Sequence, residues 1–442
     1  MKYIYGLNKS GRSIIDYLDS INENYFCWDD NYKKREELKN INNAISYAEP
    51  NNLNFKLIDD SFITPGVSFK DKKIQILKNN KIPLLRDLEL YSRISKDKKI
   101  IAITGTNGKS TTTKLISDVL KKNNIKNFIG GNIGLPLLEC FKEKNKLEFH
   151  VIELSSFQLE CKTSLKPYIS VLLNISPDHL DRYKSYDEYA TYKEKIIHLN
   201  KNGFNIVSID DSKTLEIYKK NIKNVIPVSL NYIEKGIFFD DYKIIDNFFE
   251  DKKIIKIPKI SNSLFGKFNQ QNILAAYTVT KILKININNF LKTVEFFKGL
   301  PHRLENVYND KNLQIINNSK ATNVESLIKS VENFENIFLI VGGRAKESDF
   351  TKILNFNKKI KKIYLIGESS KKIFEQLKND INCEICHTLE ESIENSLKNL
   401  KNTDKKLTVL FSPGCTSFDQ YENFEARGQS FKKIVKKFVN EI

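Results

Sequence analysis

Short apolar runs alternate with amphipathic, helix-like patterns along most of the 442-residue chain. The run at 3–5 predicts a first strand, a helical pattern follows through Leu18, and a second strand ends in F-C-W-D-D at 26–30. In the last third of the chain, apolar runs end in glycine or serine before a helical pattern, at 336–341, 362–366 and 407–411. Strands that pass through such turns into helices indicate βαβ units and mostly parallel sheets.

The first turn of the chain departs from the dinucleotide-binding fingerprint. That fingerprint is G-x-G-x-x-G, whereas residues 6–11 read G-L-N-K-S-G, with Asn8 where the second glycine should let a pyrophosphate approach. A helix N-terminus near Ser10 can still receive a phosphate, and the acids at 29–30 can bind a ribose or a base. A phosphate-binding Rossmann-like unit and a nucleotide-free α/β scaffold both fit these residues.

The composition is typical of a soluble globular protein with a basic surface. Apolar residues make up 40% of the chain, charged residues 28%, and the formal net charge is +17. An excess of this size is one signature of nucleic-acid binding. Because the lysines are scattered among asparagine and isoleucine and form no block, we expect no nucleic-acid partner. The sequence shows neither an export signal nor a run of about 18 apolar residues, so we expect a cytoplasmic protein without a membrane partner.

A match to the haem-attachment motif C-x-x-C-H occurs at 383–387. The segment lies between two helical patterns, and alternation would place Cys383, Ile385 and His387 on one face of a strand. We therefore predict a plain strand, with the six cysteines of the chain reduced.

A phosphate-binding loop is indicated after the apolar strand at 100–104. The loop reads G-T-N-G-K-S-T at 105–111 and leads into a helix from about Ser110 to Lys122. Backbone N–H groups of small residues and the helix N-terminus can face phosphates, Lys109 can reach the terminal phosphates, and a hydroxyl can bind magnesium. Ile103 stands where the standard loop has its first glycine, yet the strand–loop–helix context favours ATP binding.

The length of the chain exceeds what one core of ordinary size can fill, and we expect three domains of α/β class. A lysine-rich linker near 96–99 separates a Rossmann-like N-terminal domain, residues 1–96, from the rest. A central domain with a P-loop ATPase-type parallel sheet covers residues 97–298. A C-terminal Rossmann-like domain covers residues 299–442.

The shortened loop resembles the G-T-N-G-K-[ST]-T form of the Mur ligase and folylpolyglutamate synthase family. Further blocks resemble the same family in the same order: G-N-I-G at 131–134, E-L-S-S-F-Q-L-E at 153–160 and N-I-S-P-D-H-L-D-R at 174–182. The resemblance extends over nearly the whole chain. It implies an ATP-dependent ligase that forms an amide bond through an acyl phosphate.

The block at 153–160 looks like that of the D-glutamate-adding members of the family. Together with the ending S-P-G-C-T-S-F-D-Q-Y at 412–421, it implies UDP-N-acetylmuramoyl-L-alanine and D-glutamate as substrates. The expected state is a monomer. The alternatives are another amino-acid-adding ligase or a folylpolyglutamate synthase, and, in a different class, a basic P-loop ATPase acting on nucleic acid. The sequence shows neither a D-N-P-R type motif nor a basic stripe interleaved with aromatic residues.

Glu153 ends the mostly apolar strand at 149–152, where a carboxylate can face the phosphate loop and bind magnesium. By resemblance His179 binds a second magnesium ion, and Lys193, in the family's Y-x-x-x-K pattern, becomes carbamylated and helps to hold it. Without these motifs the ordinary interpretations are a strand-end acid, a structural histidine and a solvated helical lysine. The expected metal ligands for two Mg²⁺ ions are Ser110, Glu153, His179 and Lys193 as carbamate. The expected catalytic residues are Lys109, Glu153, His179, Lys193 and Arg303.

The resemblance also implies binding contacts along the whole chain. For ATP these are Gly105, Thr106, Asn107, Gly108, Lys109, Ser110, Thr111, Asn269, Asn272, Arg303 and Asn318. For the other substrates they are Asn132, Ser155, His179, Lys320, Thr322, Lys346, Ser417, Phe418 and Phe424, with Lys346 pairing with the incoming glutamate. The chain departs from the family at Phe268, where histidine is usual, at Asn318, where aspartate is usual, and at Glu347 beside Lys346.

Overall fold

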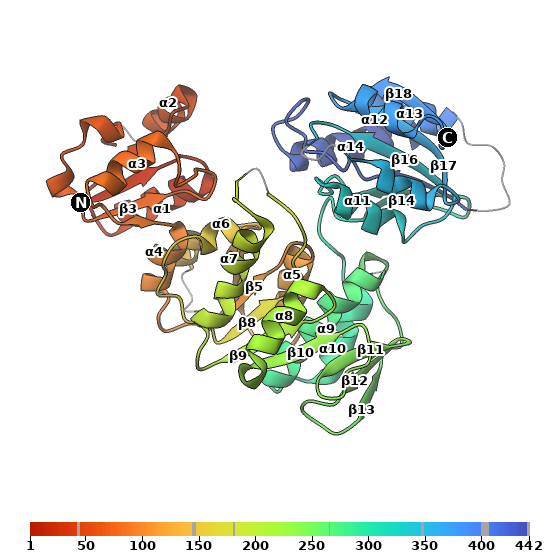
Figure 1. Ribbon diagram of the computed structural model, residues 1–442, viewed down its shortest axis with the longest axis horizontal. Helices are drawn as coiled ribbons and strands as arrows, with labels where there is room; N and C mark the ends of the chain where they lie inside the picture. Colours follow the sequence, from red (N-terminus) through yellow and green to blue (C-terminus); the bar gives the residue numbers. More distant parts are fainter. Residues whose placement is uncertain are drawn as a thin grey trace. The chain divides into compact units, whose positions relative to one another are not determined.

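The computed structural model describes residues 1–41, 45–143, 147–179, 182–264, 266–345, 349–398 and 406–439. The chain divides into two compact units. Unit 1 comprises Met1–Lys259 and Gln270–Glu295, and unit 2 comprises Ile260–Asn269 and Phe296–Ile442. Within the described residues the strands form three sheets, two in unit 1 and one in unit 2 (Figure 1). The predicted α/β class is confirmed, while the domain boundaries after residues 96 and 298 stay predictions.

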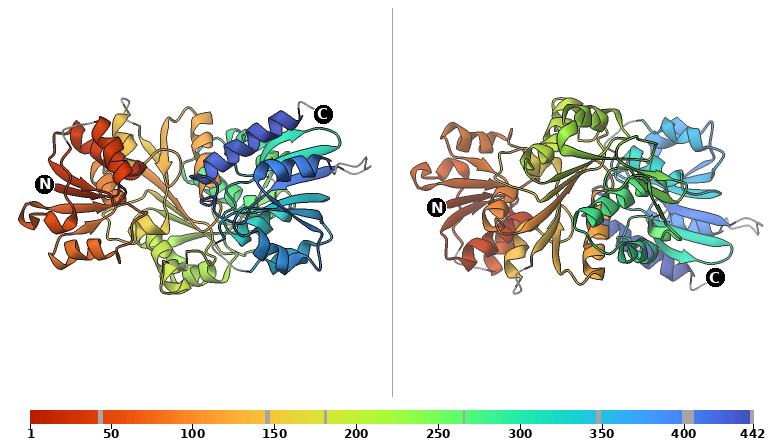
Figure 2. Two further views of the ribbon diagram at one scale, coloured as in Figure 1. Left: turned by 90° about the horizontal axis from the view of Figure 1, so that it is seen from above. Right: turned by 90° about the horizontal axis from the view of Figure 1, so that it is seen from below.

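The N-terminal sheet of unit 1 has the strand order β2-β1-β3-β4, and all its pairings are parallel among the residues described. Helices flank its strands on both faces (Figure 2). Its elements are β1 (Lys2–Tyr5), α1 (Lys9–Ser20), β2 (Tyr25–Trp28), α2 (Tyr32–Ile41), β3 (Asp60–Ile63), α3 (Lys72–Asn79), β4 (Leu84–Leu85) and α4 (Asp87–Ile94). The predicted strand–helix–strand opening is confirmed.

The second sheet of unit 1 has the order β13-β12-β11-β10-β9-β8-β5-β7-β6. It is parallel from β6 to β11 and antiparallel at β12 and β13. Its strands are β5 (Lys99–Thr104), β6 (Asn127–Gly131), β7 (Phe149–Glu153), β8 (Ile169–Leu172), β9 (Phe204–Ser208), β10 (Val225–Ser229), β11 (Ile237–Asp240), β12 (Lys243–Asp246) and β13 (Lys253–Lys256). The helices in this stretch of chain are α5 (Lys109–Lys122), α6 (Ser156–Leu159), α7 (Tyr186–Leu199), α8 (Ser212–Lys220), α9 (Lys267–Ile282) and α10 (Ile287–Phe296).

The sheet of unit 2 has the order β14-β15-β19-β16-β17-β18 and is parallel except at β14. Its strands are β14 (Glu305–Asn309), β15 (Leu313–Asn317), β16 (Ile337–Gly342), β17 (Ile360–Ile366), β18 (Cys383–His387) and β19 (Leu407–Phe411). Its helices are α11 (Val324–Val331), α12 (Ser370–Leu377), α13 (Leu389–Lys398) and α14 (Phe424–Val439).

The haem-like motif forms strand β18, as predicted. Its alternation breaks at the end of the strand, because His387 pairs with Ile366 across a register shift and adopts a left-handed backbone with φ of 55°. Cys386 is buried in the core, whereas His387 is exposed and does not share a face with Cys383 and Ile385. Burial raises the pKa of the Cys386 thiol to about 12, which makes it a poor nucleophile.

The central strands β7 and β8 are buried along their whole length, as expected of a parallel sheet that is covered on both faces. In β5, Ile101, Ala102 and Ile103 are fully buried, and the core around Ala102 continues to the helices of the N-terminal sheet. Among the described residues, none of the helices has the length and apolar character needed to cross a membrane.

His150 in β7 is a buried titratable group that links the two sheets of unit 1. Its Nδ1 lies 2.9 Å from the hydroxyl of Tyr91 in α4, and the imidazole packs against Phe128. Burial lowers the pKa of His150 from 6.5 to about 4.

We predict that protonation of His150 lowers the free energy of unfolding as the pH falls. Because the unfolded chain takes up the proton first, the contribution of His150 is complete above pH 6.5 and is lost as the pH falls toward 4. The loss should be on the order of 2–3 kcal/mol in the free energy of unfolding. Urea denaturation at pH 7 and pH 5 should show a smaller pH effect for His150→Gln than for wild type. The exposed His198→Gln is the control, and equal pH effects in all three proteins would contradict the prediction.

Candidate active site

The phosphate-binding loop lies between β5 and α5, at the carboxyl edge of the long sheet. Two of its glycines have backbone conformations that side chains disfavour, with φ of 152° at Gly105 and 84° at Gly108. A Cβ atom on Gly108 would lie 2.4 Å from the side-chain oxygen of Asn272. The loop therefore requires glycine at this position both for its turn and for the close approach of α9.

Glu153 is the meeting point of three predicted site residues. Its carboxylate accepts hydrogen bonds from Ser110 Oγ at 2.5 Å and from Asn132 Nδ2 at 2.7 Å. The parallel register explains the meeting, since Glu153 pairs with Ile103 of β5 on one side and Gly131 of β6 on the other. The side chain is 1% exposed, so a buried carboxylate faces the first turn of α5.

Two lysines converge on the backbone of the same loop. Lys109 Nζ donates to the carbonyls of Gly105 and Thr106 at 2.8 and 2.7 Å, and Lys193 Nζ donates to the Gly105 carbonyl at 2.7 Å. Lys193 is 1% exposed; burial, followed by the nearby charge of Lys109, lowers its pKa well below the usual value. Lys195, two residues on, instead donates to the carbonyls at the end of α6.

The segment after β8 holds the other side of the loop. The backbone N–H of Thr106 donates to the carbonyl of Asn174 at 2.8 Å, and that of Asn107 donates to the side-chain oxygen of Asn174 at 2.8 Å. Asn174 was not among the predicted site residues, although it opens the N-I-S-P block. Its side chain orients the loop from a neighbouring strand, which is a contact that the spacing along the chain does not reveal.

His179 lies at the end of the same segment, with φ of 54°. Its Nε2 lies 3.5 Å from a carboxylate oxygen of Asp178, and its ring meets the edge of Phe157 at a centroid distance of 4.7 Å. The following residues of the block, Leu180 and Asp181, lie outside the described residues.

Four further predicted contacts lie on the helices α5 and α9 or at the N-cap of α6. Ser155 caps α6 in a capping box with Gln158. Thr111 is half-buried in the first turn of α5. In α9, Asn272 accepts a hydrogen bond from Thr112 Oγ1 at 2.9 Å. Asn269, three residues earlier on α9, is buried and falls within unit 2.

In unit 2, Lys320 and Phe424 come together. The ammonium of Lys320 lies 3.9 Å from the centre of the Phe424 ring. Ser417 is buried, Phe418 is 62% exposed, and Thr322 and Arg303 are half-buried. Lys346 and Glu347 lie outside the described residues.

Asn318 is held inside unit 2 by three neighbours. Its amide nitrogen lies 2.6 Å from Ser330 Oγ and 3.3 Å from Ser412 Oγ, and its oxygen accepts from the backbone N–H of Leu304 at 3.2 Å. A carboxylate at this position could accept these contacts but could not donate.

Ser110 and Glu153 offer the kind of ligands that magnesium prefers, a hydroxyl and a carboxylate oxygen. The described residues contain no group of three or more His, Cys, Asp and Glu side chains placed to hold a metal ion. The predicted set does not require such a group, since it combines one carboxylate with a hydroxyl, an imidazole and a modified lysine. The donor chemistry at Ser110 and Glu153 therefore fits one magnesium ion without further protein carboxylates.

Residues 103–280, which carry the loop, Glu153, His179 and Lys193, match the family model for the Mur ligase middle domain. The UDP-N-acetylmuramoylalanine--D-glutamate ligase of Rickettsia bellii (strain RML369-C) is 36% identical over 98% of this chain and 96% of its own length. The protein of the same name from Natranaerobius thermophilus is 33% identical over 98% and 97%. The chain belongs to the Mur ligase family.

Solved structures of Mur ligases share the fold at low sequence identity. The UDP-N-acetylmuramate-alanine ligase MurC from Thermotoga maritima has a TM-score of 0.62 at 17% identity and covers 100% of this chain and 99% of its own. MurF from Acinetobacter baumannii has a TM-score of 0.61 at 16% identity and covers 86% and 92%. The α/β architecture of this Mur ligase is therefore that of its family.

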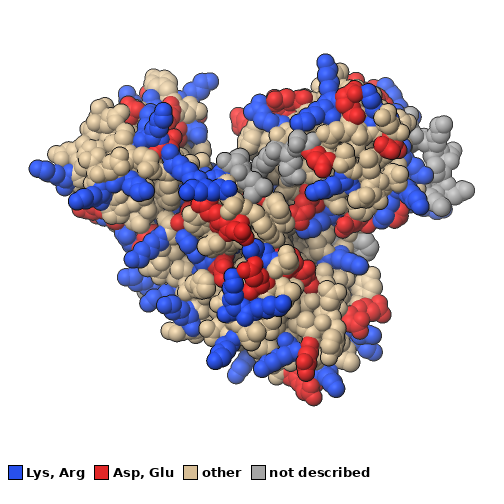
Figure 3. All heavy atoms as spheres, in the orientation of Figure 1, with Lys and Arg blue, Asp and Glu red and all other residues tan. Residues whose placement is uncertain are grey.

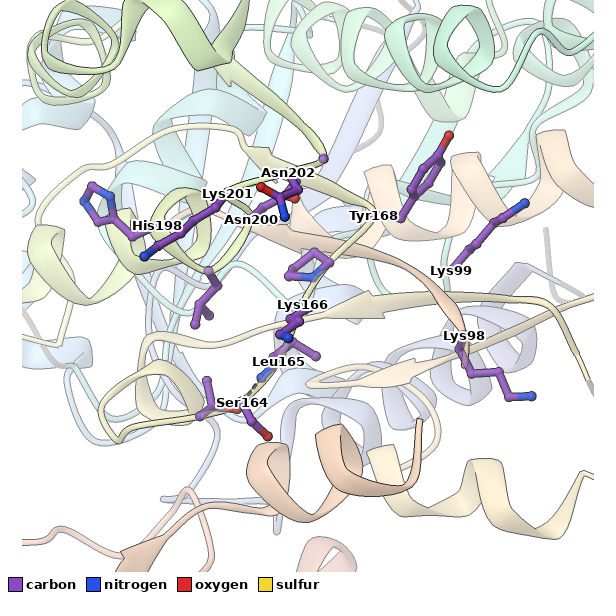
Figure 4. A pocket seen from close by; sticks show the side chains of 14 residues that line it. Lys98, Lys99, Ser164, Leu165, Lys166, Tyr168, His198, Asn200, Lys201 and Asn202 are labelled. Carbon is purple, nitrogen blue, oxygen red and sulfur yellow. Dashed lines mark hydrogen bonds between the residues drawn. The ribbon is translucent and has the colours of Figure 1, made fainter. Parts of the chain in front are cut away.

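A cavity of about 650 Å³ lies elsewhere on unit 1 of this Mur ligase, where β5, β8 and β9 begin (Figure 4). The labelled side chains of Lys98 and Lys99 lie on the opposite side of it from His198 and Lys201, and Lys98 and Lys99 pair with Asp97 and Glu148. Parallel α/β sheets bind ligands at the carboxyl ends of their strands. None of the predicted site residues lines this cavity, and we assign it no catalytic role.

Arg427 in α14 was not predicted, yet it joins two loops of unit 2 that carry predicted substrate contacts. Its guanidinium donates to the hydroxyl and carbonyl of Ser319 at 3.0 and 2.8 Å and to the carbonyls of Cys415 and Thr416 at 3.0 and 3.1 Å. Burial lowers its pKa to about 10, so it stays charged at neutral pH. Arg427 lies beyond the S-P-G-C-T-S-F-D-Q-Y segment at 412–421, and a lone arginine on a helix gives no signal of this contact.

We predict that Arg427→Met destabilises this Mur ligase by about 3 kcal/mol or more, because buried carbonyl oxygens lose their donor. Arg427→Lys should be intermediate, since an ammonium cannot span all the acceptors. Arg344→Met is the matched control, because that arginine is 54% exposed and its ion pair with Glu368 contributes little. Urea denaturation measures the free energy of unfolding, and similar losses in Arg427→Met and Arg344→Met would refute the prediction.

Proposed function

We propose that this Mur ligase joins D-glutamate to the L-alanine carboxylate of UDP-N-acetylmuramoyl-L-alanine, at the expense of ATP. The observation that carries the proposal is the meeting of Ser110, Asn132 and Glu153 beside the phosphate-binding loop. It occurs in a chain that is similar, over 98% of its length, to proteins named UDP-N-acetylmuramoylalanine--D-glutamate ligase. The N-terminal domain, residues 1–96, would bind the UDP-sugar, residues 97–298 ATP, and residues 299–442 the amino acid.

The reaction needs activation because a carboxylate oxygen is a poor leaving group. The alanine carboxylate attacks the γ-phosphorus of ATP, ADP leaves, and an acyl phosphate forms. The amine of D-glutamate then attacks the acyl carbon, phosphate leaves, and the amine loses a proton. Lys109 and Arg303 would neutralise charge on the transferring phosphoryl group. The backbone of residues 105–111 and the side chains of Asn269, Asn272 and Asn318 would bind ATP.

Two magnesium ions would supply positive charge at the transferring phosphoryl group. Ser110 and Glu153 would hold one ion, and His179 and the carbamate of Lys193 would hold the other. An amine must be uncharged to react with carbon dioxide, and the burial of Lys193 favours the uncharged form. The Gly105 carbonyl, 2.7 Å away, orients the nitrogen at the loop.

The substrate-binding side chains would divide between the two units. Asn132, Ser155 and His179 of unit 1 would contact the UDP-sugar, and a set in unit 2 would bind D-glutamate: Lys320, Thr322, Lys346, Ser417, Phe418 and Phe424. The contact between Lys320 and Phe424 supports this assignment, because an ammonium held on a ring face can still donate hydrogen bonds to a carboxylate.

We further propose that the protein acts as a cytoplasmic monomer without a nucleic-acid or membrane partner. On the face seen in Figure 3, lysine and arginine side chains are spread over the surface among acidic ones. Such a distribution favours a solvated basic surface over a dedicated polyanion site.

The decisive test supplies ATP, magnesium and UDP-N-acetylmuramoyl-L-alanine and varies the amino acid among D-glutamate, L-glutamate and diaminopimelate. We expect phosphate release with D-glutamate alone. Glu153→Gln should lower kcat by about 100-fold or more, because the buried site loses its charge toward magnesium. Release that requires L-glutamate and a folate, or that responds to DNA or RNA, would replace the proposal by one of its alternatives.

We predict that activity depends on carbon dioxide through Lys193. In buffer labelled with ¹³C-bicarbonate, wild type should give a carbamate signal in the ¹³C NMR spectrum, and Lys193→Arg should lack it. Lys193→Arg should lose activity by about 100-fold or more, since a metal ligand is removed. Lys195→Arg, on the same helix, should retain both the signal and most of the activity. Full activity after removal of carbon dioxide would count against the carbamate.

A further inference from the structure

An ion cluster of Arg86, Glu160 and Arg182 lies where the two sheets of unit 1 meet. One carboxylate oxygen of Glu160 lies 2.5 Å from Arg86 Nη2 and 2.8 Å from Arg182 Nη2, and the other accepts from Arg182 Nε at 2.8 Å. The side chains are 0%, 9% and 13% exposed in the order Arg86, Glu160, Arg182. The carboxylate thus holds two guanidinium groups in fixed orientations.

Both guanidinium groups also bind the backbone of the loop that follows β3. Arg86 Nη1 donates to the carbonyls of Ile63, Thr64 and Val67 at 3.0, 2.8 and 3.0 Å. Arg182 donates from Nη1 to Pro65 at 3.0 Å and from Nη2 to Val67 at 3.3 Å. Because β3 is parallel to β1, this loop lies at the carboxyl edge of the N-terminal sheet, where α/β folds bind their ligands.

The same cluster reaches the candidate active site in the other direction. The guanidinium of Arg182 stacks 4.0 Å above the ring of Phe157, and that ring meets the imidazole of His179 at 4.7 Å. Phe157 belongs to α6, which begins three residues after Glu153. A continuous set of contacts therefore joins the loop after β3 to His179.

Buried ions of this kind are a costly way to gain stability, because desolvation offsets much of the attraction. What they provide is geometry: each guanidinium uses several donors in one plane, and any shift would leave a buried charge without its partners. A cluster that holds loop 63–67 against α6 therefore resists sliding of one sheet relative to the other.

We propose that Arg182 is a positioning residue, which acts with Glu160 and Arg86 to set the distance between the substrate carboxylate and the γ-phosphate. The UDP-sugar would be held at the carboxyl edge of the N-terminal sheet, and the phosphates at the loop after β5. This inference rests on the proposed function. It assigns Arg182 no contact with either substrate, so binding and turnover should respond differently to its replacement.

The test compares Arg182→Lys and Glu160→Gln with wild type and with Arg93→Lys. Arg93 also pairs with two carboxylates, Glu89 and Asp60, but is 37% exposed and serves as the matched control. We expect both cluster variants to lower kcat by about 10-fold or more, since small misplacement of reacting atoms costs this much. The KM for ATP and the calorimetric affinity for UDP-N-acetylmuramoyl-L-alanine should stay close to wild type.

Hydrogen exchange provides a measurement that does not depend on catalysis. Backbone amides at 61–70 and at 169–179 should exchange faster in Arg182→Lys than in wild type, and Arg93→Lys should change neither segment. Unchanged exchange, or kcat losses that only match the loss of folded protein, would overturn the proposal. If wild type released no phosphate with D-glutamate, the proposed function would fail. Hydrogen exchange would still test the coupling of segments 61–70 and 169–179, and unchanged exchange in Arg182→Lys would then overturn that coupling.

Discussion

The position of one carboxylate determines what this site can do. Glu153 ends β7, and the strands on either side of β7 carry the phosphate-binding loop and Asn132. Because these strands are parallel, their carboxyl ends meet at one edge, and the acid comes within 2.5 Å of the first helical hydroxyl, that of Ser110. If β7 slipped by one residue, the Glu153 side chain would point to the other face of the sheet, and its hydrogen bonds with Ser110 and Asn132 would be lost.

Buried ionisable side chains of unit 1 and unit 2 are accommodated in three different ways. The pKa of Lys193 is lowered by burial, which favours the neutral amine that the proposed carbamylation requires. Arg427 stays charged and is satisfied by neutral carbonyl and hydroxyl oxygens. Glu160 holds its two arginines by ion pairing. The charged side chains of Arg427 and of the Arg86–Glu160–Arg182 cluster hold loops in place.

The departure from the family at Asn318 has a local explanation in unit 2. Its amide nitrogen is placed to donate to Ser330 and Ser412, while its oxygen accepts from the Leu304 backbone. An aspartate could not donate, so the serine hydroxyls would have to reorient toward it. Asn318 is thus compatible with a fixed loop after β15. Compared with aspartate, it removes one negative charge near the expected nucleotide.

Much of the fold and part of the site follow from the sequence alone, because both depend on short-range patterns. Apolar runs ending in glycine marked the parallel strands, and the G-T-N-G-K-S-T segment marked a loop whose glycines tolerate its backbone. Only tertiary structure decided which distant residues meet. It placed Lys193 rather than Lys195 against Gly105, brought Asn174 to the loop, and joined Arg86, Glu160 and Arg182. Those contacts depend on strand order, register and the burial of charge, which neighbouring residues along the chain do not determine.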